Sequence, residues 1–337
     1  MKKYKVGILG ATGAVGAEMI KILAQRNFPI SELVPMASAN SAGKTLPYSD
    51  RTFTIVEAKP EAFEGLDIVL GAAENDIAEN FAPAIKQAGA VFIDNSSAFR
   101  LCDDVPLVIP EINGEDIFTH KGIIANPNCT TIVTLMAVKA ISDISPIETM
   151  VVSSYQATSG AGIAGPAELL AQSKAIAEDK PIPAAKVFQY QIAYNVIPQI
   201  GGFGDNGYSS EEMKLQNEGR KIMHLPELKV TCTCVRVPVI RSHSVSVQLI
   251  TKEKVTPLEA KQAIAAFPGC VLEDDTTQSI YPMPLLTSDQ DLIFVGRIRE
   301  DLTNPRGLAL WSCGDQIRKG AATNAVQIAE RLIGGAK

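Results

Sequence analysis

The stretch "GILGATGAVG", residues 7–16, decides the fold expected for this chain. It begins within a strand-like run, residues 4–9, and ends within a helical pattern, residues 14–26. Four glycines mark this turn from strand to helix: Gly7, Gly10, Gly13 and Gly16. Glycines let backbone N–H groups approach a pyrophosphate, and the N-terminus of a helix favours its negative charge. The stretch therefore predicts a dinucleotide site, with a structural turn in another kind of α/β protein as the alternative.

The first part of the chain alternates strand-like and helical stretches. A helical pattern over residues 76–89 separates some of the short apolar runs, which are 32–38, 53–58, 67–73 and 90–95. Strands that alternate with helices predict a parallel sheet covered on both faces.

The pattern changes after about residue 130. Three longer runs alternate polar with apolar residues, which predicts an antiparallel sheet with one buried face: 148–158, 229–240 and 243–252. Helical stretches at 164–179 and 209–223 lie between them. We therefore expect a second, α+β domain over residues 129–314. The amphipathic stretch 315–335 carries Ile317, Ala321, Ile328 and Leu332 near one face, and we expect it to complete a first domain of residues 1–128 plus 315–337.

Charge and cysteine content narrow the class of protein. The net charge is −6 and no block of lysine and arginine occurs, so we expect no nucleic-acid partner. The apolar run near the N-terminus is too short for a signal peptide or a membrane span, so we expect no membrane partner. Six cysteines form no CxxC pair and only three histidines are present, so we predict no metal site. Free thiols in a reducing cytoplasm fit this composition.

The loop "ASANSAGK", residues 37–44, bears on the choice of dinucleotide. An NAD site usually has an acidic residue at the end of the second strand, and this loop has none. Ser38, Asn40, Ser41 and Lys44 offer groups for a 2′-phosphate instead, which favours NADP over NAD. The alternative is a loop without a binding role.

Cys129 lies in "ANPNCTT", residues 125–131, between a strand-like run and a helical pattern. A helix N-terminus favours the thiolate, which is the nucleophilic form of cysteine. The alternative is an inert buried thiol. Cys232 and Cys234 illustrate that alternative, because they alternate with threonines on one face of a strand.

Two polar residues share the apolar faces of neighbouring strands. His243 has the parity of Val245 and Val247, and Arg236 has the parity of Cys232 and Cys234. The pattern predicts either a lined cavity or a satisfied buried pair.

Three further residues offer charged groups. Arg100 follows a strand of the first domain, where ligands bind beyond the carboxyl ends of strands, so it could meet an anion. Glu211 and Lys214 are i,i+3 on a helix, and most such pairs are surface ion pairs.

Taken together, the chain resembles aspartate-β-semialdehyde dehydrogenases. The shared motifs stand in the family's order and spacing: "GATGAVG", "DNSSAFR", "NPNCTT", "YQATSGAG", "EEMK", "CVRVPVIRSH" and "GDQIRKGAA". The resemblance implies a Rossmann NADP-binding domain plus an α+β catalytic and dimerisation domain, similar in plan to glyceraldehyde-3-phosphate dehydrogenase. It also implies a homodimer or homotetramer.

The resemblance assigns roles to five residues of the second domain. Cys129 matches the nucleophile that forms an acyl-enzyme thioester, and His243 matches the acid/base residue. Gln156 matches the residue that contacts and orients the substrate. Arg236 matches the arginine that binds the substrate carboxylate, and Glu211 matches the partner of the substrate amino group.

Phosphate and cofactor contacts complete the predicted site. Arg100 and Lys214 match the residues that bind phosphate. The predicted cofactor contacts are Gly10, Thr12, Gly13, Ala14, Val15, Asn40, Ser41, Ser159, Gly160 and Gln316. Where many relatives have an arginine, as in "SARSAGK", this chain has Asn40. We therefore expect NADP with a weakened preference, and NAD as a weaker alternative cofactor.

The implied reaction is the reversible, NADPH-dependent reductive dephosphorylation of β-aspartyl phosphate to aspartate β-semialdehyde. It would serve the aspartate pathway to lysine and diaminopimelate, threonine and methionine. One alternative is an N-acetyl-γ-glutamyl-phosphate reductase, whose substrate has no free amino group for Glu211. Another is a non-catalytic NADP-binding protein, although Cys129 and His243 are both present.

Overall fold

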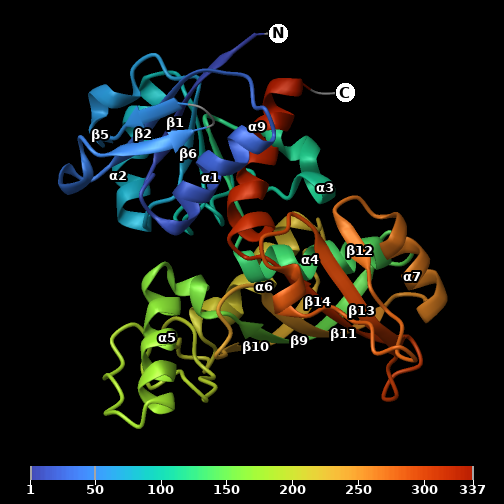
Figure 1. The fold of residues 1–337 in the computed structure, drawn as a ribbon. Coiled ribbons are helices and arrows are strands. Elements are labelled where there is room, and N and C mark those ends of the chain that lie inside the picture. The colour runs from blue at the N-terminus through green and yellow to red at the C-terminus, as the bar shows by residue number, and fades with distance from the viewer. Residues whose placement is uncertain (1, 49–50, 336–337) are drawn as a thin grey trace. The chain divides into compact units, whose positions relative to one another are not determined.

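The computed structural model describes residues 2–48 and 51–335. The chain forms two compact units, one of residues 1–128 with 321–337 and one of residues 129–320 (Figure 1). Residues 315–320, which were expected in the first domain, group with the second unit.

The first unit contains a parallel sheet of six strands in the order β5-β2-β1-β6-β7-β8. Its strands are β1 (Tyr4–Leu9), β2 (Ile30–Ala37), β5 (Val56–Glu57), β6 (Ile68–Gly71), β7 (Val91–Asp94) and β8 (Ile123–Ala125). The predicted parallel sheet is therefore confirmed. The run 53–58 is divided at Ile55, because β4 (Arg51–Thr54) forms a hairpin with β3 (Thr45–Tyr48) before β5 joins the parallel sheet.

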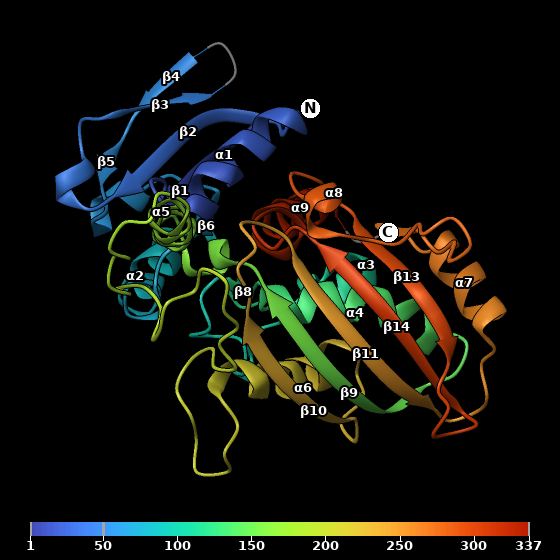
Figure 2. The same cartoon turned by 60° about the horizontal axis from the view of Figure 1, so that its bottom comes forward.

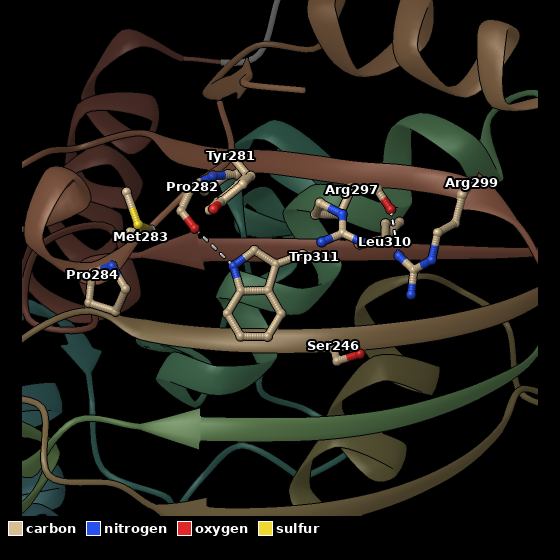
Figure 3. Close-up of a pocket in the computed structure, with 9 residues that line it drawn as sticks. All are labelled: Ser246, Tyr281, Pro282, Met283, Pro284, Arg297, Arg299, Leu310 and Trp311. Carbon is tan, nitrogen blue, oxygen red and sulfur yellow. Dashed lines mark hydrogen bonds between the residues drawn. The ribbon is translucent and has the colours of Figure 1, made fainter. Parts of the chain in front are cut away.

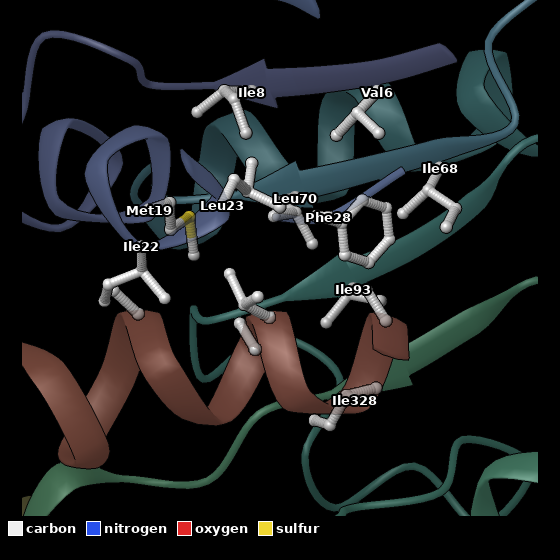
Figure 4. Close-up of a cluster of buried hydrophobic side chains, with 14 of the residues drawn as sticks. Val6, Ile8, Met19, Ile22, Leu23, Phe28, Ile68, Leu70, Ile93 and Ile328 are labelled. Carbon is white, nitrogen blue, oxygen red and sulfur yellow. The ribbon is translucent and has the colours of Figure 1, made fainter. Parts of the chain in front are cut away.

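Helices cover both faces of this sheet. The helices α1 (Ala14–Gln25) and α9 (Thr323–Gly334) share one apolar core with the strands, whereas α2 (Asn75–Gln87) packs against β7 from the other face. Figure 4 shows Met19 and Leu23 of α1, Ile328 of α9, and Leu70 and Ile93 of the sheet in this core. Shorter elements are η1 (Ala39–Ser41), η2 (Pro60–Phe63), α3 (Pro110–Asn113) and η3 (Gly114–Thr119).

The second unit contains another sheet of six strands, in the order β10-β9-β11-β14-β13-β12. Its strands are β9 (Ile147–Gln156), β10 (Lys229–Arg236), β11 (His243–Thr251), β12 (Cys270–Leu272), β13 (Ile293–Glu300) and β14 (Gly307–Gly314). The expectation of an antiparallel sheet was wrong in part, because β9 pairs with β10 and β12 with β13 in parallel. The long helical connection between β9 and β10 permits the parallel pairing, and alternation within a strand carries no signal about the direction of its neighbour.

One face of the mixed sheet is covered by helices. The helix α4 (Cys129–Ser142) packs against β9, β11, β13 and β14, and α6 (Ser210–Ile222) packs against β10. Figure 2 shows the strands in front of these helices. The remaining elements are η4 (Thr158–Ala161), α5 (Ala164–Ala177), α7 (Pro257–Ala266), α8 (Pro284–Thr287) and the π-helical turn η5 (Arg318–Ala322). Over residues 2–48 and 51–335, no helix has the length and apolar character needed to cross a bilayer.

Candidate active site

Cys129 is the first residue of α4, the central helix of the second unit. Nearly every residue from Thr130 to Ile141 is buried, so packing from all sides fixes the helix and its first turn. The Cys129 side chain is only half-buried. A Cβ on Gly320 would lie 3.0 Å from Cys129 Cβ, so a larger residue at position 320 would crowd the cysteine.

Three neighbouring strands bring polar side chains to one end of the mixed sheet. Arg236 is in register with Gln156 where β10 and β9 end, and β11 begins beside them at His243. His243 is fully buried, Gln156 is 2% exposed and Arg236 is 6% exposed. The inward orientation that parity predicted for His243 and Arg236 is therefore confirmed. A Cβ on Gly160 would lie 2.8 Å from Arg236 Nη1 and 3.2 Å from His243 Nε2, so Gly160 adjoins both groups.

The hydrogen bonds of His243 define its tautomer. The Ala157 N–H donates to His243 Nδ1 at 3.1 Å, so Nδ1 carries a lone pair and the proton of the neutral ring is on Nε2. Burial and, to a smaller extent, the Arg236 cation lower the pKa of His243, and the Glu211 carboxylate opposes both effects, which leaves the pKa at about 3. His243 is therefore neutral at physiological pH, with its proton on Nε2.

This lowered pKa predicts a loss of stability in mild acid. The unfolded chain protonates His243 near its ordinary value of 6.5, whereas the folded ring protonates only near 3. Between these values the unfolded state binds more protons, so the free energy of unfolding falls as the pH falls. When the pH is lowered from about 7.5 to about 5, protonation of His243 in the unfolded chain should lower the free energy of unfolding by about 2 kcal/mol. Urea unfolding of the wild type and of His243→Asn at both pH values checks this, since the variant should lose about 2 kcal/mol less. Equal losses would contradict the lowered pKa.

Ser154 fixes the orientation of the Gln156 amide. Ser154 Oγ donates to Gln156 Oε1 at 3.0 Å, and Gln156 Nε2 then donates to Glu211 Oε1 at 3.2 Å. His243 Nε2 lies 3.4 Å from the same amide nitrogen. With the ring proton on Nε2 both nitrogens are donors, so no hydrogen bond joins them. The Nε2 proton of His243 is therefore available to a bound substrate.

Most i,i+3 pairs are surface ion pairs, but Glu211 and Lys214 form one whose carboxylate is buried. Lys214 Nζ contacts Glu211 Oε2 at 3.0 Å, but the Glu211 side chain is only 8% exposed and also accepts from Gln156. The capping box of α6, formed by Ser209 and Glu212, fixes the first turn on which Glu211 lies. The pair therefore belongs to the same polar cluster as Gln156.

Arg236 is a buried cation with a fixed position. Its Nη1 donates to the Ala157 carbonyl at 2.6 Å, and its guanidinium carbon lies 5.7 Å from the centre of the Phe188 ring. Burial lowers the pKa of Arg236, and negative charge on Cys129 and Glu211 opposes this effect.

Two of the predicted cofactor residues contact each other beside this cluster. Gln316 Nε2 donates to Ser159 Oγ, and Gln316 Oε1 accepts from the Ser242 N–H at 2.9 Å. Ser242 precedes His243, so this contact ties η4 and the segment after β14 to the start of β11. Together with Gly160, these residues lie in the second unit with Cys129 and His243.

The glycine turn lies in the first unit, as its sequence predicted. A Cβ on Gly10 would lie 2.5 Å from the Ala72 carbonyl oxygen, and one on Gly16 would lie 2.3 Å from the Gly10 carbonyl oxygen. Only glycine permits these close approaches, and α1 starts directly after Gly13. The predicted residues Thr12, Ala14 and Val15 follow the turn around this helix start.

A cavity of about 380 Å³ lies beyond the carboxyl ends of the strands in this unit. It is lined by Leu9, Gly10, Thr12, Ala37, Ser38, Ala39, Glu57, Ala58, Ala73, Ile77, Asn80 and Phe81. Such an edge is where dinucleotides bind in doubly wound sheets, and the open glycine turn on its wall fits a pyrophosphate. The predicted residues Asn40 and Ser41 belong to η1, which begins with the cavity residue Ala39.

Arg100 also lies in the first unit. Its Nε donates to the Asn126 carbonyl at 2.9 Å and one Nη donates to the Asn95 carbonyl at 2.7 Å, which fixes the guanidinium plane. Asn126 begins the turn before Cys129, and its side chain accepts from Asn324 Nδ2 at 2.7 Å. Arg100 therefore shares a hydrogen-bonded network with the turn that leads to Cys129.

Two residues of these sites were missed by the sequence reasoning. Ser154 has the parity of Gln156, which would have identified it as a neighbour on the same face. Glu57 lines the first-unit cavity from β5, although no acidic residue ends β2. The register of β2 with β5 brings Glu57 to the cavity, and the spacing of residues in the sequence does not reveal that register.

No cluster of three or more metal-binding side chains occurs in the described parts of the chain.

Two family models match the two parts of the chain. The model "Semialdehyde dehydrogenase, NAD binding domain" matches residues 5–120. The model "Semialdehyde dehydrogenase, dimerisation domain" matches residues 138–319. The glycine turn and its cavity lie in the first match, and His243, Arg236 and Gln156 lie in the second.

Similar proteins cover the whole chain. Aspartate-semialdehyde dehydrogenase of Synechocystis sp. is 49% identical over 98% of this chain and 97% of its own length. The enzyme of Aquifex aeolicus is 47% identical over 98% of both chains. Aspartate semialdehyde dehydrogenase II of Vibrio cholerae, solved as a complex with ASA, is 39% identical with a TM-score of 0.97 over 100% of both chains. The Candida albicans enzyme, solved with NADP, is 25% identical with a TM-score of 0.76 over 98% of this chain and 99% of its own. The chain therefore belongs to the aspartate-semialdehyde dehydrogenase family of oxidoreductases.

Proposed function

We propose that this chain catalyses the reversible, NADPH-dependent reductive dephosphorylation of β-aspartyl phosphate to aspartate β-semialdehyde. The observation that carries the proposal is one buried polar cluster in the second unit, in which His243 and Arg236 both adjoin Gly160, and Gln156 donates to Glu211. Cys129 begins α4 in the same unit, and its charge is among those that act on the pKa of Arg236. A nucleophilic sulfur, a neutral proton donor and a buried cation are what acyl transfer from an anionic substrate requires.

The substrate is held by its two charged ends. Arg236 binds the α-carboxylate, because a guanidinium can donate to both carboxylate oxygens in parallel. Glu211 accepts from the ammonium group, and its own contacts with Gln156 and Lys214 keep it in place. Gln156 contacts the substrate beside them, with its amide orientation fixed by Ser154.

The chemistry begins with attack by the Cys129 thiolate on the carbonyl carbon of β-aspartyl phosphate. The C–S bond forms, the C–O bond to phosphate breaks, and a thioester on Cys129 results. We propose Arg100 and Lys214 as the residues that stabilise the departing phosphate. The hydride that reduces the thioester is supplied by the nicotinamide cofactor when it is bound.

His243 is the acid/base residue of this proposal and works from the neutral ring. Its Nε2 proton forms a hydrogen bond to the substrate oxygen as negative charge develops there. The Ala157 N–H holds Nδ1 and keeps the proton on Nε2 between turnovers.

Cofactor contacts are proposed on both units. The glycine turn would hold the pyrophosphate, and Asn40 and Ser41 would lie near the adenosine ribose. Ser159, Gly160 and Gln316 would contact the nicotinamide half. Because Asn40 is neutral, we propose that NADP is preferred only weakly and that NAD is also used.

The function is tested by phosphate-dependent reduction of NADP with aspartate β-semialdehyde. We expect turnover with this substrate, little turnover with N-acetylglutamate γ-semialdehyde, and NADP favoured over NAD by about tenfold or less in kcat/KM. Preference for the N-acetylated substrate would assign the chain to the alternative reductase. Equal or better use of NAD would overturn the NADP preference, and no turnover with either aldehyde would favour a non-catalytic protein.

We also propose that two copies associate through the sheet face opposite α4, within the segment matched by the dimerisation model. Val151 is 45% exposed and Tyr155 is 39% exposed on that face, and the Tyr155 ring lies 5.4 Å from Trp311. Figure 3 shows Trp311 donating from Nε1 to the Pro282 carbonyl, at 3.0 Å, in a cavity of about 320 Å³. Light scattering should give twice the chain mass, and Tyr155→Glu should give monomers. A tetramer would require a further interface, and a monomeric wild type would contradict the proposal.

The place of action is proposed from the cysteines and from the reaction. None of the six cysteines, all of which lie within the described residues, forms a disulfide, which suits a reducing compartment. We propose the cytoplasm, where the chain would act in the aspartate pathway to lysine and diaminopimelate, threonine and methionine.

A further inference from the structure

Glu57 is an acidic residue on the wall of the first-unit cavity. It ends β5, which pairs in parallel with β2 so that Ala37 is in register with Glu57. The Ala58 N–H donates to the Ala37 carbonyl at 2.8 Å, which fixes the end of β5 beside the end of β2. Backbone pairing therefore places Glu57 next to the start of the loop 38–41. Glu57 and the first residue of that loop, Ser38, line the same cavity.

The charge of this wall is negative. The Glu57 side chain is exposed, and its contact with Lys59 is a long one of 3.9 Å between two exposed groups. Such pairs are weak and are screened by salt, so Lys59 neutralises little of the negative charge of the Glu57 carboxylate. Ser38, Asn40 and Ser41 of the neighbouring loop are neutral. The cation of this loop, Lys44, does not line the cavity.

A dinucleotide with its pyrophosphate at the glycine turn directs its adenosine ribose toward the end of the second strand. A carboxylate there accepts a hydrogen bond from the 2′-hydroxyl of NAD. The same carboxylate repels the 2′-phosphate of NADP, which carries close to two negative charges at neutral pH. In many NAD sites the carboxylate that selects against the 2′-phosphate stands at the end of the second strand. In this chain the carboxylate near that position is Glu57, which belongs to the neighbouring strand β5.

We propose that Glu57 is a specificity-determining residue of the cofactor site, which lowers affinity for a 2′-phosphate and stabilises a free 2′-hydroxyl. This rests on the proposed use of both dinucleotides, and it gives the weak preference a second cause besides Asn40. In combination, a neutral Asn40 and an anionic Glu57 let the two cofactors compete at one site.

The test compares two nucleotides that differ only in the 2′-phosphate. Adenosine 5′-monophosphate and adenosine 2′,5′-bisphosphate are titrated into the full chain by calorimetry at about 0.15 M salt, where surface charges beyond roughly 8 Å are screened. In Glu57→Gln the affinity for the bisphosphate should rise about tenfold, whereas affinity for the monophosphate should stay equal or fall. Glu57→Asp, which keeps the charge, should not raise bisphosphate affinity.

Glu61→Gln is the matched control. Glu61 is an exposed glutamate of η2 that does not line the cavity, so its replacement by glutamine removes the same charge away from the site. An unchanged ratio of the two affinities in Glu57→Gln would overturn the proposal, and so would an equal rise in Glu61→Gln. Because the titration needs no turnover, its result stands apart from the aldehyde assay. A chain without dehydrogenase activity can still show the shift, and an active chain can fail to show it.

Discussion

Replacing Cys129 with alanine is expected to lower kcat for phosphate-dependent oxidation of aspartate β-semialdehyde by about 10⁴-fold or more. Without the sulfur no thioester forms, and no other thiol of the described residues takes its place at the start of α4. Cys129→Ser should lose nearly as much, because a hydroxyl is a far weaker nucleophile than a thiolate near neutral pH. Stopped-flow measurement of NADPH formation gives kcat and any initial burst.

Cys102→Ala is the control for the Cys129 variants. Cys102 is an exposed cysteine of the first unit that forms no disulfide, and its loss should leave kcat within about twofold. Cofactor binding and thermal unfolding should be nearly unchanged in all three variants, since Cys129 is half-buried and its replacement creates only a small cavity. If Cys129→Ala retained a tenth or more of the activity, the thioester mechanism would be wrong.

The second large effect is expected at Arg236. Lysine at this position keeps the charge but loses the planar pair of donors, and we expect kcat/KM for aspartate β-semialdehyde to fall about 100-fold. Methionine keeps the length without the charge and should lower kcat/KM by about 1,000-fold or more, because the substrate carboxylate then lacks its cation. Most of the loss in the lysine variant should appear in KM, as steady-state kinetics at varied aldehyde concentration would show.

Arg220→Lys controls for general effects of replacing an arginine. Arg220 lies on α6 and donates from Nε to the Leu228 carbonyl at 2.8 Å, so it also has a structural hydrogen bond in the second unit. It should keep near wild-type kinetics. A lysine variant of Arg236 with wild-type KM would show that the substrate carboxylate binds elsewhere.

The local parts of both sites follow from the sequence. The glycines of residues 7–16 mark where β1 ends and α1 begins, because strand, turn and helix are adjacent in the chain. The helix start at Cys129 is local in the same way. Parity alone also predicts that His243 and Arg236 face inward, since successive side chains of a strand point to opposite faces.

What could not be predicted depends on pairing between distant segments. Glu57 reaches the cofactor cavity through the register of β5 with β2, and Gln156 reaches Arg236 through the parallel pairing of β9 with β10. The tautomer of His243 depends on the Ala157 N–H, which is 86 residues away in the chain. No periodicity within one segment encodes such partners, so these features emerge only from the folded chain.

The packing of α9 has a consequence for synthesis of the protein. The core of the first unit contains Ala325, Val326 and Ile328 beside Ile8 and Leu70, so the two ends of the chain build it together. During translation the first 128 residues leave the ribosome long before α9 is made, and their sheet then lacks part of its apolar cover. The second unit, residues 129–320, is a continuous segment that is complete at an earlier stage. The first unit is therefore the last to close during synthesis, and its sheet keeps an uncovered apolar face until α9 is made.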